Sequence, residues 1–105
     1  MALKFTDENF QKQVLESEIL VLVDFYADWC GPCKMMSPVI EELAEQYQDT
    51  VKIGKINVDE EPNTAQEYKV MTIPTLLFIK EGKVLETIIG VVSKSSLSEK
   101  IDLYK

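Results

Sequence analysis

Residues 19–27 read Ile-Leu-Val-Leu-Val-Asp-Phe-Tyr-Ala, a stretch that is apolar on both of its alternating faces. A strand with one face in water alternates apolar and polar side chains, whereas a strand covered on both faces is almost continuously apolar. The stretch therefore predicts a strand buried between two layers of helices, which restricts the chain to an α/β fold.

A helical pattern follows this strand over residues 33–48, and Pro38 falls inside it. The pattern resumes directly after the proline, so we expect a kink there and not an end. Residues 51–58 are rich in β-branched side chains and predict a second strand. Strand, helix and strand at this length predict a βαβ unit with parallel strands. The helix's apolar stripe consists of Met36, Val39, Ile40, Leu43, Ala44 and Tyr47.

Two further strands are expected over residues 75–80 and 83–89. Only Glu81-Gly82 separates them, and this spacing predicts a tight antiparallel hairpin. The sheet is therefore expected to be mixed, with parallel strands in its first half and antiparallel strands in its second.

Three more helices complete the prediction of a single α/β domain over residues 1–105, with helices on both faces of a mixed sheet. An N-terminal helix is expected from about Thr6 or Asp7, and a short one over residues 64–68. The last helix follows Gly90, with Ser93 as its N-cap. Its apolar face would consist of Leu97, Ile101 and Tyr104.

The charge balance excludes some classes of partner. The chain has 18 acidic and 11 basic residues and a net charge of −7, which disfavours binding to nucleic acid. Its longest apolar run, residues 19–23, is too short to span a membrane. Residues 1–8 have no apolar leader, so the default location is the cytoplasm, where a close cysteine pair is more often catalytic or metal-binding than structural.

Both cysteines lie in the run from Trp29 to Lys34, two residues apart, and the chain has no histidine. The lack of histidine excludes Cys-His nucleophiles and histidine-ligated metals, and a zinc site would need a second cysteine pair. As a structural staple, a disulfide closing so short a loop would contribute only about 2 kcal/mol. A Cys-x-x-Cys pair in a βαβ setting instead predicts a redox couple without a metal.

Cys30 follows the buried strand and Cys33 lies in the first turn of the helix. The unpaired N–H groups at a helix start stabilise an anion, so the Cys30 thiolate is favoured as the more exposed, attacking sulfur. Pro32 suits the helix start because its missing N–H leaves no hydrogen bond unmade there.

Asp24 lies within the strand that we expect to be covered on both faces. Burial should raise the pKa of this carboxyl. Six residues before Cys30, it can lie beneath the cysteine turn and exchange a proton with Cys33, directly or through one water. The alternative is a structural aspartate at a strand edge, facing water.

The run from Val23 to Lys34, Val-Asp-Phe-Tyr-Ala-Asp-Trp-Cys-Gly-Pro-Cys-Lys, resembles the active-site signature of the thioredoxin family. The resemblance covers essentially the whole chain, in order and without an insertion. Two positions depart from the family. Tyr26 stands where many members carry a tryptophan, and Met71-Thr72 stands where some bacterial members carry Arg-Gly. Further matches are Pro38 in the helix, residues 55–59 as the third strand, the cis-proline turn Ile73-Pro74-Thr75, and the glycines Gly82 and Gly90.

The resemblance implies the thioredoxin fold and a protein dithiol–disulfide oxidoreductase that reduces disulfides in other proteins. Pro74 would be cis and face the two sulfurs across a substrate groove, where the backbone around Thr72 would pair with an extended substrate segment. Lys55 would lie near Asp24 as a countercharge. The groove would be lined by Trp29, Gly31, Pro32, Ile73, Pro74 and Gly90.

The implied cycle needs no cofactor other than the Cys30–Cys33 disulfide. Cys30 attacks a substrate disulfide, and Cys33, assisted by Asp24, releases the product. A thioredoxin reductase would restore the dithiol of a monomeric protein. Two alternatives are a thiol oxidase or isomerase of the same fold and a non-enzymatic binding subunit. Relatives of the first kind usually carry a histidine between the cysteines, where this chain has Gly31-Pro32.

Overall fold

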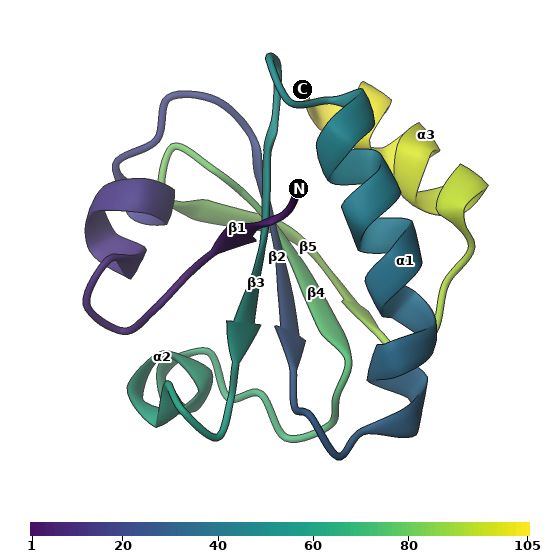
Figure 1. The fold of residues 1–105 in the computed structure, drawn as a ribbon. Helices are drawn as coiled ribbons and strands as arrows, with labels where there is room; N and C mark the ends of the chain where they lie inside the picture. Colours follow the sequence, from purple (N-terminus) through teal and green to yellow (C-terminus); the bar gives the residue numbers. More distant parts are fainter.

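The computed structural model describes residues 1–105 and contains one five-stranded mixed sheet with the strand order β1-β3-β2-β4-β5 (Figure 1). The first three strands in this order are parallel, and β4 and β5 are antiparallel to their neighbours. This confirms the predicted mixed sheet. The strands are β1 (Leu3–Lys4), β2 (Val21–Tyr26), β3 (Lys52–Asn57), β4 (Thr75–Lys80) and β5 (Lys83–Ile89).

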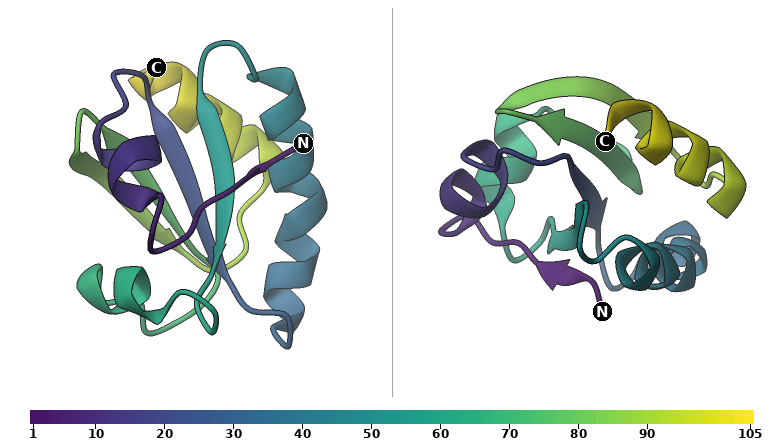
Figure 2. Two further views of the ribbon diagram at one scale, coloured as in Figure 1. Left: turned by 60° about the vertical axis from the view of Figure 1, so that its left-hand side comes forward. Right: turned by 90° about the horizontal axis from the view of Figure 1, so that it is seen from above.

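Helices cover both faces of the sheet, as predicted. The long helix α1 and the C-terminal helix α3 lie on one face, and the short helices η1 and α2 lie on the other (Figures 1 and 2). None of the helices combines the length and the hydropathy that a membrane span requires. The helices are η1 (Gln11–Leu15, a π-helix), α1 (Gly31–Gln46), α2 (Pro62–Glu67) and α3 (Lys94–Tyr104).

Strand β2 lies at the centre of the sheet and divides its side chains between two apolar cores. Leu22 packs with α1 and α3, whereas Val21, Val23 and Phe25 pack with η1 and α2. Because successive side chains of a strand point to opposite faces, Asp24 lies on the α1 face, in line with Leu22. The apolar run therefore buries one carboxyl group on the face of the sheet that α1 covers.

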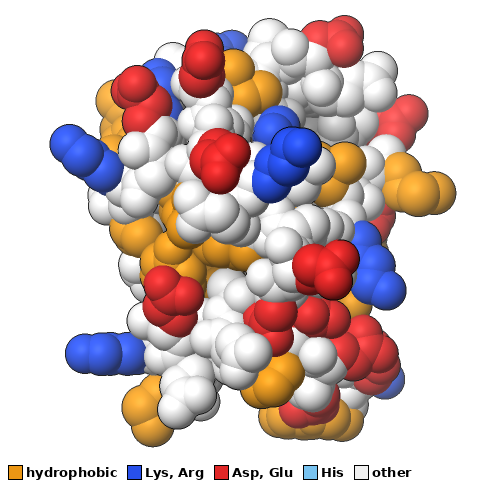
Figure 3. Space-filling model, turned by 90° about the vertical axis from the view of Figure 1, so that its left-hand side faces the viewer, with side chains coloured by type: hydrophobic (Ala, Val, Ile, Leu, Met, Phe, Trp, Pro, Cys, Tyr) orange, Lys and Arg blue, Asp and Glu red, His pale blue; other side chains and the backbone are white.

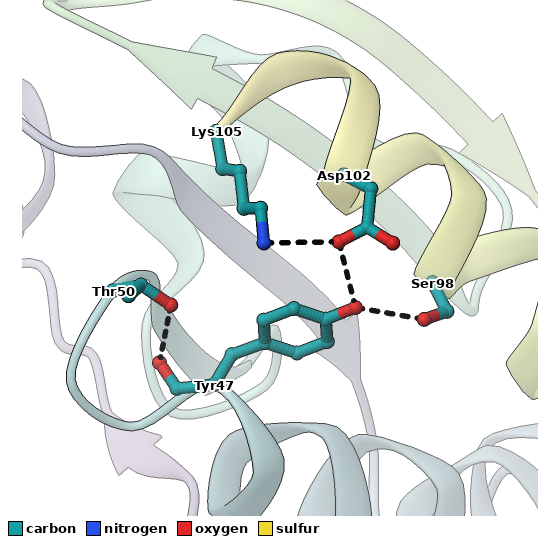
Figure 4. Close-up of polar contacts among 5 residues, drawn as sticks. All are labelled: Tyr47, Thr50, Ser98, Asp102 and Lys105. Atoms are coloured by element: carbon teal, nitrogen blue, oxygen red, sulfur yellow. Dashed lines mark hydrogen bonds and ion pairs between the residues drawn. The ribbon is translucent and has the colours of Figure 1, made fainter.

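Helix α1 continues through Pro38, and its predicted stripe faces the sheet. Its C-terminal end is tied to α3 by polar contacts around Tyr47 (Figure 4). The Tyr47 hydroxyl donates to the Asp102 carboxylate (3.0 Å) and shares a hydrogen bond with Ser98 Oγ (2.8 Å). Lys105 forms an ion pair with the same carboxylate at 3.2 Å. These contacts hold the end of α1 that is remote from the cysteines.

The β4–β5 hairpin has the predicted bounds. Glu81 and Gly82 form its turn with positive φ values of 51° and 79°. Two consecutive positive φ values are typical of the type I′ turn, whose twist matches that of paired strands. The turn residues therefore set the pairing next to the turn, and an irregularity between Phe78 and Ile79 shifts the register of the rest of the hairpin.

The N-terminal segment differs from the prediction. The helix begins at Gln11 and not near Thr6, and a short strand, β1, precedes it. Thr6 and Asn9 instead form a turn in which each side chain accepts a hydrogen bond from the other's backbone N–H. Such local side-chain hydrogen bonds compete with helix formation.

Gly54 on β3 allows β1 to approach closely. A Cβ atom at this position would lie 2.5 Å from the Phe5 ring and 2.8 Å from the Leu3 carbonyl oxygen. Strand β1 pairs with β3 through Leu3 opposite Gly54. The outer edge of β3 is therefore covered only because residue 54 has no side chain.

The molecular surface over η1 and α2 reflects the acidic composition. On this face the basic side chains stand singly, while the acidic ones gather in the lower right of the view (Figure 3).

Candidate active site

Cys30 and Cys33 form a disulfide at the start of α1, and their Cα atoms are 5.2 Å apart. Cys30 is the N-cap of the helix, and its Sγ accepts a hydrogen bond from the Cys33 backbone N–H at 3.2 Å. Gly31 and Pro32 form the first turn between them. The sulfur of Cys30 thus occupies the position where a helix best stabilises negative charge.

The two cysteines do not differ in overall exposure. Cys30 is 4% exposed and Cys33 is 3% exposed, so the expected order of exposure holds by too little to distinguish the two residues. Ala27 and the partly buried Tyr26, Val58 and Ile73 pack around them. What distinguishes Cys30 is its N-cap position and its contact with the loop before β4.

That loop contains the cis peptide bond between Ile73 and Pro74, the isomer that the resemblance implied. The carbonyl oxygen of Ile73 lies 3.8 Å from the Cys30 sulfur. The carbonyl oxygen of Thr72 accepts a hydrogen bond from the Thr75 hydroxyl. The loop therefore presents its backbone beside the disulfide, with Thr72 exposed to solvent.

Gly90 joins the same site from the end of β5. Its backbone N–H donates to the Pro74 carbonyl oxygen at 2.8 Å, and its φ is +97°. A side chain would be strained in this conformation, so the glycine allows β5 to end against the cis-proline loop.

Trp29 directly precedes Cys30 in the chain. Its side chain is 71% exposed, and its indole N–H donates to the Asp59 carboxylate at 2.8 Å. Gly31 and Pro32 beside it are also exposed. These three residues therefore present exposed surface next to the cysteines in the chain.

Asp24 lies within the α1 face of the sheet, with none of its surface exposed. Neither carboxylate oxygen has a hydrogen-bond partner. Burial raises the pKa of Asp24 from 3.8 to about 7, and the nearby charge of Lys55 offsets part of this rise. The structure thus contains a carboxyl group that can change protonation near neutral pH.

Lys55 is the register neighbour of Asp24 on β3. Its ammonium group does not form an ion pair with the carboxylate. It donates instead to Ser37 Oγ at 2.8 Å and lies 4.6 Å from the centroid of the Tyr26 ring. Lys55 is therefore a nearby countercharge for Asp24 that makes no ion pair with its carboxylate.

Sequence reasoning assigned no role to Ser37 or Asp59. Ser37 is four residues after Cys33, and a helix brings such residues to the same face. Asp59 follows β3 as Trp29 follows β2, and the carboxyl ends of parallel strands meet at one edge of a sheet. These spacings could have identified both residues. No group of three or more acidic or cysteine side chains is arranged to hold a metal ion.

Known proteins resemble this chain over nearly its whole length. The family model described as Thioredoxin matches residues 1–103. Thioredoxin 1 of Synechococcus elongatus is 48% identical over 102 residues, covering 97% of this chain and 95% of the relative. Thioredoxin of Chlorobaculum thiosulfatiphilum is 52% identical over 97 residues, covering 92% and 90%. With its cysteine pair at disulfide distance, the chain is a dithiol–disulfide oxidoreductase and belongs to the thioredoxin family.

Proposed function

We propose that this protein reduces disulfides in other proteins, with Cys30 as the attacking thiolate and Cys33 as the resolving one. The observation that carries the assignment is the hydrogen bond from the Cys33 backbone N–H to Cys30 Sγ at the start of α1. A helix N-terminus stabilises the thiolate relative to the thiol, and the thiolate is the nucleophile in disulfide exchange.

The reaction proceeds through two exchanges. The Cys30 thiolate attacks one sulfur of the substrate disulfide, forms a mixed disulfide and releases the other sulfur as a thiolate. Cys33 then attacks Cys30, which breaks the mixed disulfide and releases the second substrate thiolate. Two electrons pass to the substrate, two protons complete its thiols, and the protein leaves with a Cys30–Cys33 disulfide.

Asp24 is the proposed proton acceptor for Cys33. A buried carboxyl whose pKa is raised to about 7 binds and releases a proton at the pH where Cys33 must ionise. A hollow of about 200 Å³ lined by Cys33, Ser37 and Lys55 lies on this side of α1. It is large enough for water beside Cys33, and we propose that such a water carries the proton toward Asp24.

The substrate segment is proposed to lie extended along the cis-proline loop, with its backbone paired at Thr72. Ile73, Pro74 and Gly90 line one side of the path, and Trp29, Gly31 and Pro32 line the other. The exposed indole ring and the exposed loop beside a nearly buried disulfide support this assignment.

The remaining proposals concern the surroundings of the reaction. We propose that the protein is a cytoplasmic monomer, folds as a single domain and needs no cofactor beyond its own disulfide. A thioredoxin reductase is the proposed electron donor, because the disulfide formed in each cycle must be reduced again.

Cysteine variants test the assigned roles. Cys30→Ser should abolish insulin reduction, because the attacking thiolate is absent. Cys33→Ser should accumulate a covalent mixed disulfide, because no second thiolate resolves it. Mass spectrometry of the Cys33→Ser protein after incubation with insulin measures this adduct, and the double variant is the control. Adduct formation through Cys33 in a Cys30→Ser protein would reverse the roles.

The same assay separates the alternative functions. Reduction supported by an NADPH-linked or ferredoxin-linked reductase identifies the electron donor. A non-enzymatic binding subunit would keep its partner when both cysteines are replaced by serine. An oxidase would form disulfides in a reduced substrate faster than it reduces insulin.

A further inference from the structure

The ammonium group of Lys55 has two partners, and neither is Asp24. It donates a hydrogen bond to Ser37 Oγ at 2.8 Å and lies over the Tyr26 ring at 4.6 Å from the centroid. A cation over an aromatic face is attracted by the negative charge density of the ring. Both partners therefore hold the ammonium in one place.

The fold brings these residues together. Tyr26 is two residues beyond Asp24 on β2, so both side chains lie on the α1 face. Lys55 pairs with Asp24 in the parallel register of β2 and β3. Ser37 reaches the ammonium from α1, one turn after Cys33. The side chains of Tyr26, Ser37 and Lys55 line the same hollow of about 200 Å³ as Cys33.

Lys55 is the charged neighbour that acts on Asp24. The pKa of Asp24 is raised by burial and lowered by the charge of Lys55. From β4, the register neighbour of Asp24 is the apolar Leu76. From α1 and the loop before it, the titratable and charged side chains at the hollow are Cys33, Lys34 and Asp28, and Tyr26 is the titratable neighbour on β2. The ammonium group of Lys55 is thus the charge that lowers the pKa of Asp24, against the larger effect of burial.

We propose that Ser37 and Tyr26 are positioning residues that hold the Lys55 ammonium beside the hollow and thereby fix the proton affinity of Asp24. Their part in catalysis rests on the proposed role of Asp24 as the proton acceptor for Cys33. The positioning itself is a property of the folded protein and can be measured without a substrate.

The direction of the effect follows from the chemistry of lysine. An ammonium on a flexible chain is strongly hydrated, and Lys55 is only half-buried. Without the Ser37 oxygen it moves outward into water, away from Asp24. The attraction between the two charges falls with distance and with the higher dielectric of water. The carboxylate is then less stabilised, and Asp24 holds its proton to a higher pH.

Carbon-13 NMR of the Asp24 carboxyl, followed from pH 5 to 9 in the oxidised full-length protein, tests the proposal. Ser37→Ala should raise the titration midpoint by a few tenths of a pH unit, about a twofold to fourfold rise in proton affinity, and Lys55→Met should raise it further. Ser37→Thr keeps the hydroxyl and should restore the wild-type midpoint. Ser95→Ala, an exposed serine on α3, is the matched control.

Variants of Tyr26 test the second partner. Tyr26→Phe keeps the ring face and should leave the midpoint near the wild-type value, whereas Tyr26→Leu should raise it. In a Lys55→Met background, Ser37→Ala and Tyr26→Leu should have no further effect, because the ammonium they position is gone. Non-additivity of this kind identifies residues that act through one group.

The proposal is overturned if the Asp24 midpoint in Ser37→Ala equals the wild-type value or falls below it. It is also overturned if Ser37→Ala shifts the Asp24 midpoint by the same amount in the wild-type and in the Lys55→Met background. The pH profile of insulin reduction is measured in parallel. A shifted NMR midpoint with an unshifted activity profile supports the positioning and counts against the proposed proton acceptor, so the two failures are distinguishable.

Discussion

Asp24 lies buried on the α1 face of the sheet with both carboxylate oxygens unpartnered, whereas Asp7 lies at the start of α2 and accepts three hydrogen bonds. The donors to Asp7 are the backbone N–H groups of Asn63 and Thr64 and the Thr64 hydroxyl, at 3.2, 2.8 and 2.6 Å. The Asp24 carboxylate accepts no hydrogen bond from the protein in place of those it would accept from water. The Asp7 carboxylate accepts hydrogen bonds from protein donors instead.

The pKa values of the two carboxyl groups shift in opposite directions. For Asp24, burial dominates and raises the pKa to about 7. For Asp7, burial also acts upward, but the hydrogen bonds from Thr64 and Asn63 outweigh it and lower the pKa below 3.8. Burial alone therefore does not decide which form of a carboxyl group is stable. The hydrogen-bond donors around the carboxyl group decide which form is stable. Of the two aspartates, only Asp24 can hold a proton near neutral pH.

The largest expected effect is that of Asp24→Asn on stability. In the folded state Asp24 keeps its proton up to about pH 7, while the unfolded chain releases it near 3.8. Wild-type stability should therefore fall as pH rises between these values, by about 4 kcal/mol in total. Asp24→Asn should be more stable than wild type at pH 8, by up to this amount, with the gain vanishing near pH 4.

Denaturant unfolding between pH 4 and 8 measures this gain, and rapid-mixing reduction of insulin measures the loss of the proposed proton acceptor. Glu8→Gln, at an exposed position, is the control for removing one carboxylate. A gain that does not depend on pH would mean that burial does not raise the pKa of Asp24.

Asp7→Ala should have the opposite sign and a smaller size. It removes the carboxylate that accepts from the backbone at the start of α2, and loss of such a capping oxygen costs about 1–2 kcal/mol. Because the folded pKa of Asp7 is lowered, its contribution is present above the unfolded pKa and is lost as pH falls through the folded value. Urea unfolding should show a smaller difference in stability between wild type and Asp7→Ala at pH 3 than at pH 7. Equal stability of Asp7→Ala and wild type at pH 7 would show that the hydrogen bonds to Asp7 do not stabilise the fold.

The smallest expected effect comes from Thr64→Val, which removes one donor and keeps the size of a buried side chain. We expect a loss of about 0.5–1 kcal/mol at pH 7, because two backbone donors to Asp7 remain. The pKa of Asp7 should move upward, toward its ordinary range. An NMR titration of Asp7 measures this shift, and an unchanged value would show that the hydroxyl contributes nothing to the charge preference.

Parts of the fold fixed by local chemistry could be predicted from the sequence. The bounds of β4 and β5 follow from the apolar runs and from Glu81-Gly82, whose backbone conformation selects the turn. The stripe on α1 and the N-cap of α3 are equally local, and Ser93 accepts from the Ser96 N–H as expected. The N-terminal segment was only partly predictable, because the Thr6–Asn9 turn is local but the Asp7 carboxylate is bound to α2, more than fifty residues away in sequence.

The candidate site shows the same division. The closeness of Cys30 and Cys33 could be predicted from their spacing in the sequence. The burial of Asp24 could be predicted from the apolar run around it. The position of the Lys55 ammonium could not, because it depends on which of three neighbouring groups the flexible side chain selects. Opposite charge favoured Asp24, but the ammonium lies against a hydroxyl and an aromatic ring.

Gly54 has a consequence for the solubility of the protein in the cell. Strand β1 has only two residues, yet it covers the outer edge of β3 by lying where a Cβ atom at position 54 would be. Any larger residue there would displace Leu3 and Phe5 and leave a parallel strand with unpaired backbone groups at the margin of the sheet. Such an edge accepts strands from other molecules and leads to aggregation. The absence of one side chain thus protects the folded protein from self-association.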